Sequence, residues 1–159
     1  MKPASVKELK DELKFKTKEE LQDYCIRLAK FKKENKELFT YLLFDASDEE
    51  AYIGKVKAEI IVQFEAINQR NYYFVKKSVR KILKETKKYI RYSGKKETEV
   101  EILLFFCLKL KEMRPDYRRE PVLKNTFNRQ VSLIENRLKN LHEDLQYDFQ
   151  KELDLLRGS

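Results

Sequence analysis

The sequence is poor in the residues that form tight turns. Its 159 residues include three glycines and three prolines, too few for the turns of a protein built from many β-strands. It also lacks a long apolar run, because the stretch from Ile102 to Leu108 stops at Lys109 and cannot cross a membrane. With 42% hydrophobic and 39% charged residues, the chain has the composition of a folded, soluble protein.

Long helices joined by short connections account best for this scarcity of turn residues. We predict an all-α fold, a single-domain bundle of about six or seven helices over residues 1–157. Gly158 and Ser159 are expected to be a tail left by cloning. A short α-solenoid-like array of helices is the alternative, although no repeat of about 34 to 45 residues recurs.

Four capping boxes, each a Ser or Thr followed three positions later by Glu, precede stretches with helical apolar spacing. They are Ser5/Glu8, Thr17/Glu20, Ser47/Glu50 and Thr98/Glu101. Together with the apolar periodicity they predict helices over about 6–13, 18–34, 36–44, 48–67, 72–92, 99–113 and 122–155.

The predicted 122–155 helix has apolar residues in alternating steps of four and three, the spacing of a coiled coil. The spacing then changes at Phe149, a stutter that would relax a supercoil locally. Such a helix could join two copies of the chain. Aromatic residues such as Tyr24 and Phe31 lie on predicted apolar faces, so we expect most aromatics in the core.

Catalytic motifs are missing. His142 is the only histidine and has no second histidine at position 146, which excludes a zinc-protease pair. Cys25 and Cys107 lie among apolar neighbours and are predicted to be buried free thiols, which favours a reducing, cytoplasmic location. The three glycines, at positions 54, 94 and 158, are too far apart to form a phosphate-binding loop. We therefore expect no catalytic residues and no cofactor.

A cluster of acids at Asp45, Asp48, Glu49 and Glu50 could suggest a metal site. It lacks the glycine and the closing glutamate of a calcium loop, and the N-terminal dipole of a helix explains it. We expect no metal site. An enzyme whose active site consists of carboxylates brought together by folding remains an alternative.

The charge of the chain is concentrated in one segment. Residues 76–96 contain ten basic side chains and one acid, Glu85, whereas the rest of the chain has 25 basic and 26 acidic side chains. The whole excess behind the net charge of +8 therefore lies in these 21 residues.

On a helix, the cations of this segment fall on one arc of about 140° and the apolar residues fall on the opposite side. We call the cations, together with the aromatic residue on the same arc, the basic stripe. It comprises Lys76, Lys77, Arg80, Lys81, Lys84, Lys87, Lys88, Arg91 and Tyr73.

Four interpretations of the basic stripe are open: a solvated face neutralised by acids of other helices, a nucleic-acid-binding face, a surface for an acidic protein, or a membrane-surface contact. We expect a non-catalytic binding module that presents the basic helix and binds nucleic acid without reading its sequence. The alternative is a helical protein–protein interaction scaffold, a homo-oligomer joined through residues 122–155, with the basic face merely solvated.

Overall fold

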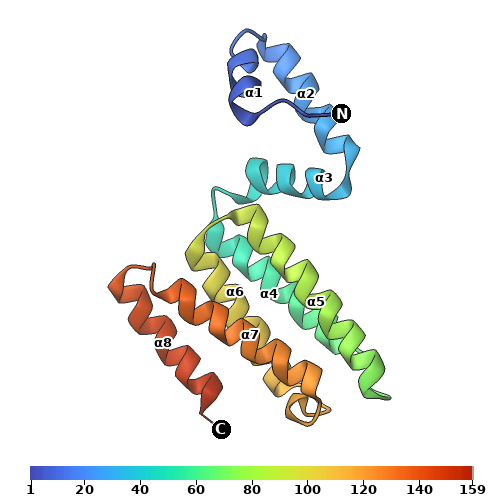
Figure 1. Cartoon of the computed structure of the whole chain (residues 1–159), viewed down its shortest axis with the longest axis vertical. Helices are drawn as coiled ribbons and strands as arrows, with labels where there is room; N and C mark the ends of the chain where they lie inside the picture. Colours follow the sequence, from blue (N-terminus) through green and yellow to red (C-terminus); the bar gives the residue numbers. More distant parts are fainter. Residues whose placement is uncertain (159) are drawn as a thin grey trace. The chain divides into compact units, whose positions relative to one another are not determined.

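Eight α-helices and no β-strand make up the described part of the chain, residues 1–158, in the computed structural model (Figure 1). The all-α prediction is confirmed, and the number of helices is close to the six or seven expected. The helices are α1 (Val6–Leu13), α2 (Lys18–Phe31), α3 (Lys33–Thr40), α4 (Glu49–Glu65), α5 (Tyr72–Ser93), α6 (Lys96–Glu112), α7 (Pro121–Leu138) and α8 (Glu143–Arg157).

The helices fall into two compact units. The N-terminal unit comprises Met1–Phe44 with α1 to α3, and the C-terminal unit begins at Asp45 and holds α4 to α8. A π-helical turn, Tyr41–Asp45, follows α3, and a 3-10 turn, Tyr117–Arg119, precedes α7. A single domain over residues 1–157 stays a prediction.

Helix α6 forms the centre of the C-terminal unit. It packs against α4, α5, α7 and α8. Consecutive helices from α4 to α8 run in opposite directions (Figure 1). Its sequence is apolar on nearly every side, so Ile102, Phe106 and Leu110 are fully buried. Phe106 meets Phe64 of α4 with ring centroids 5.7 Å apart. A helix surrounded in this way is typical of a bundle rather than a solenoid.

The continuous helix predicted over 122–155 is wrong. Helix α7 ends at Leu138, and α8 starts after His142, whose Nδ1 accepts a hydrogen bond from the backbone N–H of Asp144. The break lets α8 fold back so that Leu153 is buried while α8 packs on both α6 and α7. Burial of this second apolar stripe explains why the helix does not continue.

The N-terminal unit buries few of its apolar residues. Among its residues, only Ala29 and Tyr41 are buried. The prediction that Tyr24, Phe31 and Cys25 are core residues is wrong, because all three are exposed. Helices α1 and α3 have eight residues each and do not cover α2.

Two predicted helix starts in the C-terminal unit are also wrong. Asp48, not Ser47, caps α4 by accepting a hydrogen bond from the backbone N–H of Ala51. Helix α6 begins at Lys96, so Thr98 lies inside it and is buried. Thr98 is therefore packed in the core and does not cap α6, whose first helical residue follows Lys95.

Candidate polyanion-binding face of helix α5

Local sequence defines both ends of α5. The side chain of Asn71 accepts a hydrogen bond from the backbone N–H of Phe74 at the N-terminus. Gly94 ends the helix with φ +71°, in the left-handed region that glycine adopts without a steric penalty. The observed bounds, Tyr72–Ser93, therefore agree closely with the predicted 72–92.

Apolar packing fixes the rotation of α5. Val75, Val79, Ile82 and Ile90 are buried against the bundle, where α5 contacts α4 and α6. The hydroxyl of Tyr52 on α4 also donates a hydrogen bond to the backbone carbonyl of Tyr89, at 2.7 Å. With this face turned inward, the opposite arc must face solvent.

Three further contacts hold the two ends of α5. The hydroxyl of Tyr72 donates to the backbone carbonyl of Asp116 at 3.1 Å. At the other end, the hydroxyl of Ser93 and the ammonium of Lys95 each lie 3.2 Å from a carboxylate oxygen of Glu49. Both ends of α5 are therefore anchored to the C-terminal unit.

The structure places the predicted basic stripe on the outer side of α5. Six of its eight cations are exposed, whereas Lys76 and Lys88 are half-buried. Lys76 lies 3.6 Å from Glu120, and Lys88 has a contact within the protein. The exposed six are Lys77, Arg80, Lys81, Lys84, Lys87 and Arg91.

Within residues 1–158, none of these six side chains forms an ion pair or hydrogen bond. Glu85, the one acid of the segment, accepts a hydrogen bond from Gln63 of α4 and so lies to the side of the stripe. The acids of neighbouring helices therefore leave most of the stripe unneutralised.

Tyr73 adds an aromatic ring to the N-terminal end of the stripe. Its side chain is 66% exposed. The ring meets Phe74 edge to face, with centroids 5.4 Å apart and an interplanar angle of 77°. An exposed ring held beside cations is a suitable surface for stacking a nucleic-acid base.

The axial spacing of the six exposed cations is comparable with that of phosphates along a nucleic-acid strand. From Lys77 to Arg91 the helix rises about 21 Å, so the five intervals between the six cations average about 4.2 Å along the axis. One strand of duplex DNA carries a phosphate every ~3.4 Å. The linear charge densities of the stripe and of one nucleic-acid strand are therefore similar.

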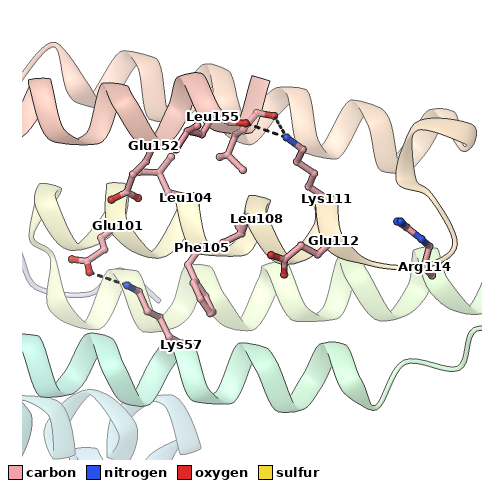
Figure 2. Close-up of a pocket in the computed structure, with 11 residues that line it drawn as sticks. Lys57, Glu101, Leu104, Phe105, Leu108, Lys111, Glu112, Arg114, Glu152 and Leu155 are labelled. Carbon is pink, nitrogen blue, oxygen red and sulfur yellow. Dashed lines mark hydrogen bonds and ion pairs between the residues drawn. The ribbon is translucent and has the colours of Figure 1, made fainter. Parts of the chain in front are cut away.

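The C-terminal unit also contains a cavity of about 630 Å³ between α4, α6 and α8 (Figure 2). Leu104, Phe105 and Leu155 give it apolar walls, and Glu101 and Glu152 lie at one end. Sequence reasoning missed this site. Its residues come from three helices far apart in the chain, and no local motif marks them.

Charged groups around the cavity are largely engaged by other groups. Lys57 Nζ lies 2.9 Å from Glu101 Oε1, and Lys111 Nζ donates to the backbone carbonyls of Leu155 and Leu156 at 3.1 and 3.0 Å. Partial burial raises the pKa of Glu152, opposed by Lys57 and reinforced by Glu101. Folding thus brings two carboxylates together, but a lysine neutralises one of them.

The remaining candidate residues have structural roles or none. Burial raises the pKa of the Cys107 thiol to about 12, far from the range of a nucleophilic thiolate. Asp45 pairs with Lys55 at 2.6 Å, and Asp48 caps α4. In the part of the chain that the structure describes, no group of three His, Cys, Asp or Glu side chains could hold a metal ion.

Comparisons with known proteins give no relative: no protein-family model, curated protein or solved structure matches this chain. Among the described residues, none of the helices combines the length and the apolar character that crossing a membrane requires.

Proposed function

We propose that the protein is a non-catalytic module that binds the phosphate backbone of single-stranded nucleic acid through the outer face of α5. The observation that carries this proposal is the set of six exposed cations that lack any ion pair within residues 1–158. The alternative, a solvated face neutralised by acids of other helices, would require ion pairs to these cations. Six of the eight cations have none within residues 1–158.

The energetics of α5 favour an anionic ligand. Cations four residues apart, such as Lys77 and Lys81 or Lys87 and Arg91, repel each other and cost the helix about 0.2–0.5 kcal/mol per pair. A bound row of phosphates would replace this repulsion with attraction and release condensed counterions. The ligand would therefore stabilise the helix that binds it.

Binding through this face should tolerate many nucleotide sequences. Four of the six exposed cations are lysines, whose ammonium groups supply charge without the planar, bidentate geometry that reads a base edge. Tyr73 would stack on any base, since every base has an aromatic face. A cytoplasmic location belongs to this proposal, because exposed Cys25 is a free thiol and suits a reducing compartment.

The test is a fluorescence-anisotropy titration of a labelled single-stranded oligonucleotide with the full chain. One variant reverses three cations of the stripe, Lys77→Glu, Lys84→Glu and Arg91→Glu. A matched variant has the same change in net charge but reverses exposed Lys124, Arg129 and Lys139 on and just after α7.

We expect the α5 variant to lose at least about a hundredfold in affinity, because each lost phosphate contact also loses its counterion release. The matched α7 variant should lose less than about tenfold, through net charge alone. Equal losses in the two variants, or no binding by the unmodified chain, would contradict the proposal. Circular dichroism of both variants checks that the helices are intact.

A further inference from the structure

The N-terminal unit exposes an unusual amount of apolar side chain. Twelve of its Val, Leu, Ile, Phe and Tyr residues are exposed, including Phe15 at 81% and Phe31 at 76%. Together they leave on the order of 1,000 Å² of apolar surface in water. Scattered apolar residues are common on protein surfaces, so the residues that share one face of the unit are the informative ones.

Part of this surface forms a groove between α1 and α2, a hollow of about 660 Å³. Leu9 and Leu13 line it from α1, and Tyr24, Leu28 and Phe31 line it from α2. The α2 residues are spaced by four and three, so they form one continuous stripe along the helix. Figure 1 shows α1 lying beside α2 as a short helical hairpin.

Local hydrogen bonds define where both helices of this hairpin begin. Thr17 and Glu20 form a capping box at the start of α2, and Ser5 and Glu8 form one at the start of α1. The groove is thus formed by two well-defined helices whose facing apolar residues are only partly covered. Such a surface is preformed for another helix.

We propose that this groove is the interface of a homodimer, in which the α1–α2 hairpin of one chain packs against the same hairpin of a second copy as a four-helix bundle. The five apolar residues that line the groove expose on the order of 500 Å², close to the apolar share of the roughly 800 Å² that each partner contributes to a standard interface. A two-fold axis would place the same apolar stripe on both sides of the contact.

Charges at the rim of the groove fit a second copy. Glu12 is negatively charged, and Lys16 and Arg27 are positively charged. In a dimer, Glu12 of one copy could pair with Lys16 or Arg27 of the other, whereas a purely acidic or purely basic partner would leave charges of one sign unpaired. Homo-oligomerisation through residues 122–155 is less favoured, because Phe127, Val131 and Ile134 are buried inside the C-terminal unit.

Sedimentation velocity of the full chain over a range of concentrations tests this interface. We expect a concentration-dependent species of twice the monomer mass. Leu28→Asp and Phe31→Asp, both at exposed groove positions, should each shift the dissociation constant at least about a hundredfold, because each buries a charge in the contact.

Ile26→Asp is the matched control. Ile26 lies on the same helix with 50% exposure, against 63% for Leu28, but does not line the groove. It should leave the dimer intact. Circular dichroism confirms that each variant keeps its helices.

Three outcomes would overturn the proposal: an unmodified chain that stays monomeric at all concentrations, a dimer that survives both groove substitutions, or equal loss in the Ile26→Asp control. A monomer that co-sediments with anionic lipid vesicles through the same apolar residues would assign the groove to a membrane surface instead. Because these substitutions lie far in sequence from α5, oligonucleotide binding by a monomeric variant separates this proposal from the proposed function.

Discussion

The N-terminal and C-terminal units differ in how well capping boxes read from the sequence predict where their helices start. In the N-terminal unit, both predicted capping boxes form, at Ser5 and at Thr17. In the C-terminal unit, neither predicted box starts a helix, since Asp48 replaces Ser47 and α6 begins three residues before Glu99. The reciprocal capping box thus marks the helix starts of the N-terminal unit, whereas helices of the C-terminal unit start at single side-chain caps such as Asp48 and Asn71.

Burial shows the same contrast. The C-terminal unit closes around α6, whereas the N-terminal unit leaves most of its large apolar side chains in water. An amphipathic pattern predicts a helix equally well in both cases. It does not tell whether the partner of the apolar face lies in the same unit or in another molecule.

The largest expected effect is the difference in stability loss between two variants, one in each unit, that each lack a phenylalanine ring. Phe106→Ala leaves a cavity at a fully buried position and should lower the free energy of unfolding by about 3–5 kcal/mol. Phe15→Ala, at an 81% exposed position, should change it by less than about 0.5 kcal/mol. Urea denaturation followed by circular dichroism measures both.

Similar losses in the two phenylalanine variants would show that the N-terminal unit has a core of its own. The contrast between the units would then be lost.

The sequence predicts these elements unequally well. Residues 6–13 and 72–92 come close to the observed α1 and α5, because caps and apolar spacing agree there. The exposure of the basic stripe also follows from helical geometry, since the apolar face on the opposite side of α5 must be buried. The cavity beside Lys57 and the break before His142 depend on contacts between distant helices, and a linear pattern does not contain them.

A medium effect is expected at the caps. Thr17→Ala removes the side chain that accepts a hydrogen bond from the backbone N–H of Glu20 and should destabilise α2 by about 1 kcal/mol. Ser47→Ala should have almost no effect, because Asp48 caps α4. Hydrogen exchange of the first-turn amides of α2 and α4 reports each cap separately.

If Ser47→Ala accelerated exchange in α4 as much as Thr17→Ala does in α2, the observed start of α4 would be contradicted. If the Thr17→Ala variant exchanged its α2 amides at the rate of the unmodified chain, the Thr17 cap would not stabilise α2.

The smallest effect concerns Glu152 in the cavity. Burial raises the pKa of this carboxyl, so its ionisation costs stability as the pH rises through the folded-state pKa. Glu152→Gln should therefore raise the melting temperature at pH 7 by about 2 °C or less. Below the unfolded-state pKa both proteins carry a neutral side chain, and the difference should vanish.

Thermal melts at pH 7 and near pH 3.5 measure the contribution of Glu152. A lower melting temperature of the Gln variant at pH 7 would mean that the ionised carboxylate stabilises the fold through Lys57.

The most direct test of the central claim is the salt dependence of oligonucleotide binding by the unmodified chain. Six phosphate contacts by the exposed cations of α5 predict that the logarithm of the binding constant falls with the logarithm of salt concentration, with a slope of about −4 for a single strand. The Lys77→Glu, Lys84→Glu and Arg91→Glu variant should have about half this slope or less. A slope near zero, or one that the α5 substitutions leave unchanged, would contradict the claim that this face binds a phosphate backbone.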